Sequence, residues 1–119
     1  MNIEQHTAKA QRVLSSLAKL HFPEDYLALI DGAVVAGYHL GNALLHKHGV
    51  SDSALHFNSP SKLEVPISGL PAAIQPAFKA FAELERLRFE YVRNPSCYEP
   101  AVADLVKRNL DAMKRTNHI

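Results

Sequence analysis

The sequence predicts an all-α fold, and three observations indicate this class. The stretch from Asp25 to His48 is almost wholly apolar, which suits a helix that is buried on most of its sides. Within it, Ala33, Gly37 and Gly41 are four positions apart, so they share one face and let another helix approach closely. The stretches before and after it repeat apolar residues at helical spacing. We therefore expect a compact domain of four helices in which this stretch is the central one.

Length and charge limit the architecture and the partners. With 119 residues, the chain is long enough for one sizeable core and too short for two, so we expect a single domain, 1–119. The 13 basic and 12 acidic residues give a net charge of +1, so no global field attracts nucleic acid or an anionic membrane. The N-terminal residues lack a signal pattern, and no run reaches the roughly 18 apolar residues of a membrane span. A cytoplasmic protein without membrane contact is expected.

Local signals place the first two helices. Asn2 and Gln5 have the spacing of a capping box, which predicts a first helix from about Asn2 to Leu20. Pro23 interrupts the pattern, so the second helix should start within residues 23–25. Gly49 is suited to a left-handed cap and should end it. The buried stripe of the first helix is predicted to be Ala10, Val13, Leu14 and Leu17.

The segment 50–69 is predicted to be a long loop, because it is rich in serine, asparagine, proline and glycine. A loop of this length inside a compact domain is either functional or ordered by packing on the bundle through Leu55 and Phe57. The alternation of Leu63, Val65 and Ile67 also fits a short strand, although the neighbouring proline argues against a central one.

The C-terminal half predicts two more helices. The third should follow Pro71 or Pro76 and run to about Arg93, with a ridge of alternating charge facing solvent. The fourth should begin within residues 96–100, where Ser96 and Glu99 have capping-box spacing. The ridge is predicted to be Lys79, Glu83, Arg86 and Glu90. The cations of the last helix, Lys107, Arg108, Lys114 and Arg115, are interpreted as a solvated face, and Cys97 as a packing residue.

A polar line on the second helix is the first candidate site. The line consists of Asp31, His39, Asn42 and His46, which share one edge of an otherwise apolar helix. Such an edge can bind a nucleotide or a metal ion, or it can simply be the solvated side of the helix. His39 and His46 are two turns apart, about 10 Å along the axis, too far to share one ion without other ligands. We therefore predict no metal site and no cofactor.

Two arginines near the end of the third helix are the second candidate site. Arg88 falls on the apolar face, where an unpartnered charge is costly, so it needs an acceptor such as Asp31, Glu85 or a bound anion. Arg93 and Asn94 stand at the helix end, where arginine either grips a phosphate or interacts with the helix dipole. The predicted ligand-binding residues are these three together with His39, Asn42 and His46.

Several segments resemble one family. These segments are 33–45, the proline-containing loop, 84–91, and Arg93 with Asn94 before the last helix. Between about Tyr26 and Met113, their pattern of apolar and small positions is similar to that of the HEPN-like superfamily of bacteria and archaea. The resemblance implies a four-to-five-helix up-and-down bundle and a homodimer. It also implies either toxin-like RNase activity or, as in toxin-antitoxin pairs, a nucleotide-linked role beside a nucleotidyltransferase partner.

The motif of the active family members is only half present. They carry an arginine, often followed by a polar residue, and then a histidine about four to six residues further on, whereas here Tyr98, Glu99 and Pro100 stand where the histidine is expected. Tyrosine, with an ordinary pKa near 10, is a poor base at neutral pH. We therefore expect a bundle without the standard nuclease site. The alternative is a divergent metal-independent endoribonuclease in which Arg93 stabilises the phosphate and Tyr98 or Glu99 replaces the histidine.

The function predicted from the sequence is that of a non-catalytic, homodimeric binding or partner protein. Its ligand would be a nucleotide, RNA or another phosphate recognised through Arg88, Arg93 and Asn94. The second helix has more apolar surface than one groove covers, so Tyr38 and the ridge from Gly37 to Gly41 are predicted to make the dimer contact. A third possibility is a small-molecule pocket between the second helix and the loop 50–69.

Overall fold

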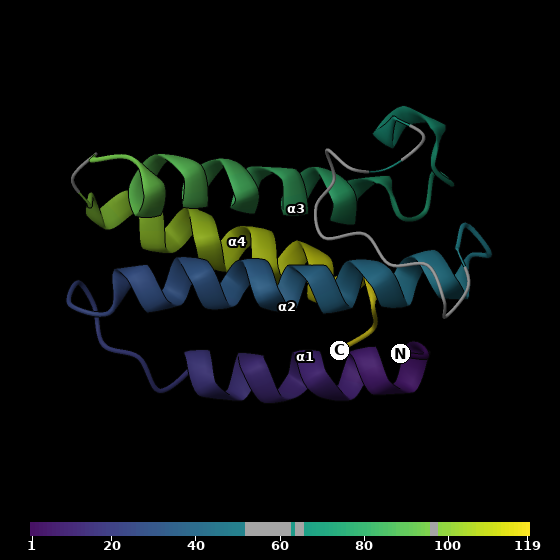
Figure 1. Cartoon of the computed structure of the whole chain (residues 1–119), viewed down its shortest axis with the longest axis horizontal. Coiled ribbons are helices and arrows are strands. Elements are labelled where there is room, and N and C mark those ends of the chain that lie inside the picture. The colour runs from purple at the N-terminus through teal and green to yellow at the C-terminus, as the bar shows by residue number, and fades with distance from the viewer. Residues whose placement is uncertain (52–62, 64–65, 96–97) are drawn as a thin grey trace.

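The computed structural model describes residues 1–51, 63, 66–95 and 98–119, which form four α-helices and contain no strand (Figure 1). The all-α prediction is thus confirmed for this part of the chain. A 3-10 turn, η2 (Ile67–Gly69), precedes the third helix, and a π-helical turn, η3 (Phe89–Arg93), extends it. The four helices are α1 (Ile3–Leu17), α2 (Tyr26–Lys47), α3 (Gln75–Arg88) and α4 (Pro100–Thr116).

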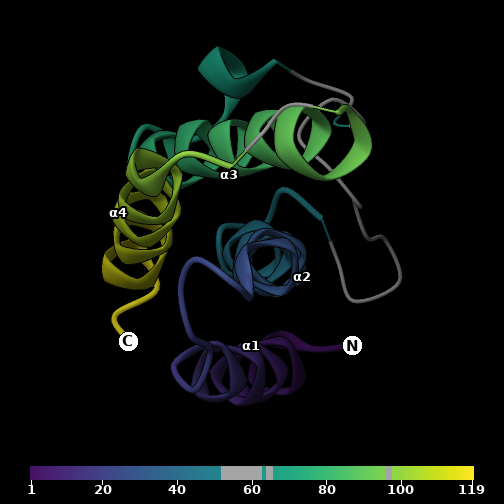
Figure 2. The same ribbon diagram turned by 90° about the vertical axis from the view of Figure 1, so that its left-hand side faces the viewer.

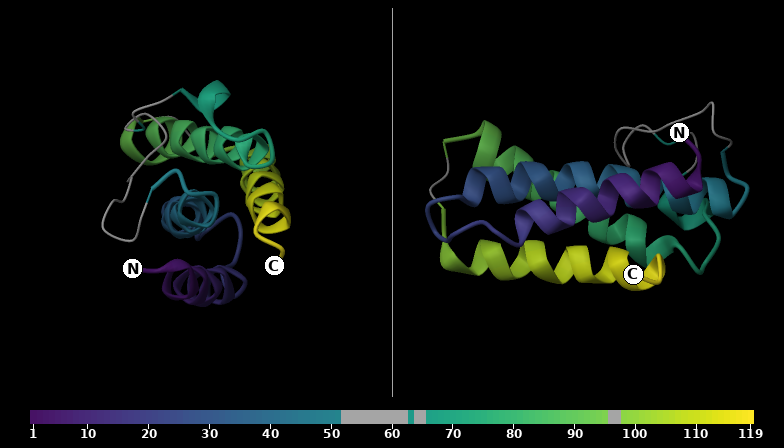
Figure 3. Two further views of the ribbon diagram at one scale, coloured as in Figure 1. Left: turned by 90° about the vertical axis from the view of Figure 1, so that its right-hand side faces the viewer. Right: turned by 90° about the horizontal axis from the view of Figure 1, so that it is seen from below.

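The helices form an up-and-down bundle around α2. Consecutive helices run in opposite directions, as the colour gradient shows in Figure 1 and in the right-hand view of Figure 3. Seen end-on in Figure 2, α2 is in the middle, with α1 on one side and α3 and α4 on the others. The predicted central position of the apolar helix is therefore confirmed, and α2 contacts each of the other three helices.

The ends of α1 and α2 follow local signals closely. The capping box is formed, because the Asn2 side chain accepts from the Gln5 amide and the Gln5 side chain accepts from the Asn2 amide, both at 2.9 Å. α1 ends at Leu17 rather than Leu20, since the amides of Lys19 and Leu20 bond three residues back in tightened turns. α2 begins at residue 26, just beyond the predicted start. Gly49 has a φ of +71°, the left-handed cap that was predicted.

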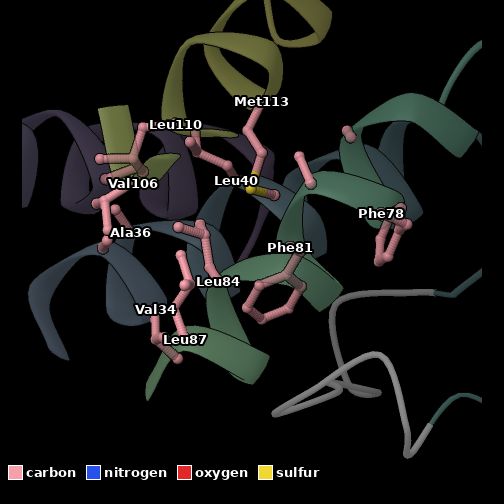
Figure 4. Close-up of a cluster of buried hydrophobic side chains, with 14 of the residues drawn as sticks. Val34, Ala36, Leu40, Phe78, Phe81, Leu84, Leu87, Val106, Leu110 and Met113 are labelled. Atoms are coloured by element: carbon pink, nitrogen blue, oxygen red, sulfur yellow. The ribbon is translucent and has the colours of Figure 1, made fainter. Parts of the chain in front are cut away.

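The small-residue ridge of α2 lies against α3. A β-carbon on Gly37 would be 2.8 Å from a ring carbon of Phe81, and one on Gly41 would be 3.4 Å from the ring of Phe78. Figure 4 shows both phenylalanines among the buried side chains of the core. The close helix approach is therefore confirmed. The prediction that this ridge makes a dimer contact is wrong, because α3 and α4 already occupy it.

α2 also corrects the expectation that no segment is long and apolar enough for a membrane. Among the described residues, this one helix reaches the length and composition of a membrane span. Of the apolar stretch concerned, 67% is buried inside the protein, as in the core helix of a soluble bundle. Length and composition alone do not distinguish a central helix from a span.

The second half of the chain departs more from its predicted pattern. α3 starts with Pro76 in its first turn, and after Arg88 the backbone continues as the π turn, in which the Asn94 amide bonds to the Phe89 carbonyl at 3.1 Å. α4 begins at Pro100, the last position of the predicted range, with Glu99 as its N-cap residue and no side-chain cap bond. The expected capping box of Ser96 and Glu99 is therefore wrong, because the helix starts after both of them.

Part of the long loop is described. Leu63 and Ile67 pack against the core, and Ile67 begins a 3-10 turn rather than a strand. The expectations for Leu55, Phe57 and Val65, and that for Cys97, lie outside the described residues.

Candidate functional site

The polar line of α2 is divided into an exposed half and a buried half. At its N-terminal end, Asp31 is half exposed, and Val35 between the polar positions is 45% exposed. Further along, His39 is 8% exposed and Asn42 only 1%. Asn42 donates to the Tyr38 carbonyl within the same helix at 2.9 Å. The solvated interpretation therefore fits the first half and is wrong for these two buried residues.

A histidine cluster covers the buried half of this line. His6 of α1 is fully buried, and its Nδ1 lies 3.0 Å from Nδ1 of His39. The His6 and His46 rings are 5.3 Å apart, and His46 Nδ1 is 3.1 Å from the Ser51 hydroxyl. One ring nitrogen of the His6 and His39 pair must donate and the other accept, which requires at least one neutral ring. The cluster is a buried polar network that connects α1 with α2.

His6 is not among the residues predicted from the sequence. It lies four positions before Ala10, on the stripe that faces α2, so the spacing alone places it on the buried face. A stripe predicted from apolar residues alone omits a buried histidine. No group of three or more His, Cys, Asp or Glu residues with a geometry for a metal ion occurs in the part of the chain that the structure describes.

Arg88 pairs with Asp31, one of its three predicted acceptors. Nε of Arg88 is 3.0 Å from a carboxylate oxygen of Asp31, but the N–H group is not aligned for a hydrogen bond, so the contact is mainly ionic. The Arg88 side chain is 38% exposed, rather than buried on the apolar face as its position suggested. An ion pair this open to water contributes little to stability. Its position between α2 and α3 matters more than its strength.

Arg88 and Arg93 line a groove of about 350 Å³ formed by α3 and the π turn. Arg86, also in the lining, is engaged by Glu83 at 2.6 Å and Glu90 at 2.7 Å, and these hydrogen bonds and charges hold its pKa above the usual value. For Arg93, no side-chain hydrogen bond or ion pair occurs with any described residue. The remaining lining residues are Ala82, Glu85 and Phe89.

Asn94 and the two residues of the alternative nuclease interpretation lie apart from this groove. Asn94 has an extended backbone after the π turn and is not part of the lining. The Tyr98 ring packs on Tyr26 at the start of α2, with ring centres 4.8 Å apart. Glu99 precedes α4. The structure thus brings Arg88 and Arg93 together, and His39 with His46 around His6, but these two groups are separate sites.

An exposed apolar surface surrounds the Asp31 and Arg88 pair. Phe89 is 59% exposed, and Leu27 and Val35 of α2 are each nearly half exposed. A shallow hollow of about 180 Å³ between Val34, Val35, Tyr38 and Arg88 adjoins it. We define the α2–α3 face as Leu27, Asp31, Val35, Arg88 and Phe89.

Comparison of the chain with protein-family models, with curated proteins and with solved structures finds no match. The HEPN-like resemblance therefore stays a prediction from the sequence pattern. What the structure establishes is an all-α bundle of four helices over the described residues, with a buried histidine cluster and an open α2–α3 face.

Proposed function

We propose that the protein is a homodimeric binding protein whose α2–α3 face packs against the same face of a second copy. The observation that carries the proposal is the exposure of Val35 and Phe89 around the ion pair that joins α2 and α3. Large apolar side chains gathered on one face of a small domain mark interaction surfaces more often than isolated ones do.

The charges of the face favour a second copy as the occupant. Asp31 and Arg88 lie side by side with opposite signs, so the face is complementary to itself when one copy is rotated by a two-fold axis. Each carboxylate can then meet the partner's guanidinium, while the apolar side chains around them exclude water. A surface with only one sign of charge would instead repel its own copy.

The other faces of α2 are already used in the monomer. Ala33, Gly37 and Gly41 are buried, and the glycines lie against α3 and α4. The far end of the polar edge is covered by His6 of α1. Within the described part of the chain, the α2–α3 face is where large apolar side chains of the central helix reach solvent. The proposed dimer therefore differs in its contact residues from the one expected from the glycine ridge.

Light scattering coupled to size exclusion tests the proposal at micromolar concentration. The wild-type chain should have the mass of two chains, and Val35→Glu and Phe89→Glu should have the mass of one, because each buries a new charge in the interface. Ile3→Glu is the matched control, since Ile3 is 39% exposed at the start of α1, away from this face. A single-chain mass for the wild type, or dimers in all three variants, would overturn the proposal.

A second candidate function is recognition of a phosphate group in the groove of Arg93. The observation in its favour is that Arg93 has no acceptor among the described residues and stands beside the exposed ring of Phe89. A guanidinium can bind phosphate in a bidentate manner, and an aromatic face can stack on a base. Glu85 in the same lining and the acceptors of Arg86 and Arg88 reduce the positive potential.

Thermal shift with inorganic phosphate, a nucleoside and a nucleoside monophosphate tests this second candidate. A genuine ligand raises the melting temperature in proportion to RT ln(1 + [L]/Kd). The monophosphate should stabilise the wild type and not Arg93→Gln, while Arg12→Gln, an exposed arginine of α1, should behave as the wild type. Equal shifts in both variants would refute recognition by Arg93. A nucleotidyltransferase partner is proposed on the family resemblance alone, and co-expression with a neighbouring gene product of that class would test it.

A further inference from the structure

Another concave site lies on the other side of α2, between α1 and α4. Figure 2 shows that both helices flank α2, and the structure contains a cleft of about 280 Å³ between them. Its wall is formed by α1, by the turn that follows it, by α2 and by α4. The large apolar lining residues are Leu14, Leu17, Leu20, Phe22, Leu29 and Leu110, and Ala18 adds a small one.

The apolar side chains at the bottom of the cleft are buried, and those at its opening are partly exposed to solvent. Leu29 and Leu110 are buried at the bottom, whereas Leu14, Leu17 and Phe22 keep part of their surface accessible although all are large and apolar. Beside these apolar side chains, water finds few of the two to four polar partners that a well-ordered water has. Filling it with hydrocarbon would remove apolar surface from water.

The mouth of the cleft carries more positive than negative charge. Lys107 extends over the Phe22 ring, with its Nζ 5.3 Å from the ring centre. Lys114, two turns further along α4, is 3.9 Å from a carboxylate oxygen of Asp111, a long distance for an ion pair. Two ammonium groups and one carboxylate therefore border an apolar space. This arrangement is complementary to a molecule with a hydrocarbon body and an anionic end.

We propose that this cleft binds a small amphipathic carboxylate. Its hydrocarbon part would lie among the leucines, and its carboxylate would pair with Lys107 or Lys114. The size agrees with such a ligand, because an apolar cavity of about 150 Å³ is known to accept benzene, and this cleft is roughly twice as large. Medium-chain fatty acids and short aryl carboxylates belong to this class.

The site is independent of the proposed dimer. Leu29 of the cleft and Asp31 of the α2–α3 face are two positions apart on α2, which places them roughly 200° around the helix from each other. Dimerisation through one face leaves the other open. Failure of either proposal therefore leaves the other untouched, and the two are measured by different experiments.

Calorimetric titration with octanoate, octylamine and octanol tests the chemistry of the cleft. The three probes share a hydrocarbon chain and differ in the charge of the end group. Octanoate should bind saturably and most tightly, octanol more weakly, and octylamine weakest, because its cation meets two lysines. Hexanoate should bind more weakly than octanoate by roughly fourfold for each methylene removed. Absence of saturable octanoate binding at millimolar concentration, or equal binding of octylamine, would overturn the proposal.

Three variants locate the binding. Ala18→Phe places a ring in the cleft from an exposed lining position and should abolish octanoate binding without loss of helical signal. Lys107→Gln and Lys114→Gln should each weaken it by about fivefold or less, as expected for a solvent-exposed ion pair. Arg108→Gln removes the same charge from an exposed position outside the lining and should leave binding unchanged. Binding that survives Ala18→Phe in a folded protein would show that octanoate binds elsewhere.

Discussion

His6 and His39 lie with their Nδ1 atoms 3.0 Å apart, although they are 33 positions apart in the sequence and belong to different helices. Both rings are buried, and the His46 ring packs close to His6. A buried polar contact of this kind fixes how α1 is oriented on the central helix, in addition to the apolar area buried between the two helices. Removal of one partner leaves the facing ring nitrogen of the other buried without this contact, which is more costly than the loss of the bond itself.

A double-mutant cycle on this pair should therefore show strong coupling. His6→Leu and His39→Leu are each expected to lower the free energy of unfolding by about 1–3 kcal/mol. The double variant should lose clearly less than the sum, because it leaves no unsatisfied ring nitrogen at the contact. Urea denaturation at neutral pH measures the free energy of unfolding of the two single variants and of the double variant. His48→Leu at an exposed position is the control, and additive losses would contradict the coupling.

The two ridge glycines should respond differently to substitution by alanine. In Gly37→Ala the new β-carbon would meet the Phe81 ring at 2.8 Å, so the core must shift, at a cost of about 1–3 kcal/mol. In Gly41→Ala the nearest atom is at 3.4 Å, an ordinary contact, and the gain in helix propensity of up to about 1 kcal/mol should make the change neutral or stabilising. Thermal unfolding of the two variants compares them directly. Equal destabilisation by the two variants would mean that the distance between the new β-carbon and the phenylalanine ring does not determine the effect.

The ion pairs of the solvent ridge should give a small loss of stability in acid. The hydrogen bond from Arg86 lowers the pKa of Glu83 below its usual 4.5, against a smaller opposing effect of burial. A carboxyl with a lowered pKa stabilises the fold at neutral pH, and this contribution disappears as the pH falls below about 4.5. Because the pair is exposed, Glu83→Gln should cost less than about 1 kcal/mol at pH 7, and this cost should become smaller as the pH falls below about 4.5. Glu24→Gln at an exposed position of the turn before α2 should show no such difference.

The alternative endoribonuclease activity should be absent. Tyr98 is packed on Tyr26, and a phenol is a poor base at neutral pH. Purified protein incubated with total RNA should therefore leave it intact, as should Arg93→Ala and Glu99→Ala. RNA cleavage by the wild type that is lost in both variants would establish the enzyme interpretation instead.

Local chemistry explains which parts of the fold could be predicted. The Asn2 and Gln5 capping box, the left-handed Gly49 and the close approach at Gly37 depend on neighbouring residues or on one face of one helix, so the sequence shows them. α4 starts within the predicted range of 96–100, but the capping box was wrong, because Ser96 and Glu99 have capping spacing while Pro100 fits a first helical turn even better. No local pattern in the sequence predicts the π turn after Arg88.

The candidate site was harder to predict for a physical reason. Whether His39 is solvated depends on His6 of another helix, which no pattern within α2 can reveal. The glycine ridge could have served either α3 or a second copy, and the sequence does not say which neighbour occupies it. The pairing of Arg88 with Asp31 was one of several open choices, and only the antiparallel register of α2 and α3 selects it.

The π turn at the end of α3 has a consequence for how this chain can tolerate insertions and deletions. A π turn has the same backbone path as an α turn with one additional amino acid accommodated in it. Because the extra residue is accommodated within the turn, deleting one residue from 89–93 should return this segment to regular α geometry and leave the chain beyond it in nearly the same direction. A deletion within α3 itself would instead rotate every later residue by about 100° around the helix axis. The π turn is thus the part of this helix where the loss of one residue disturbs the fold least.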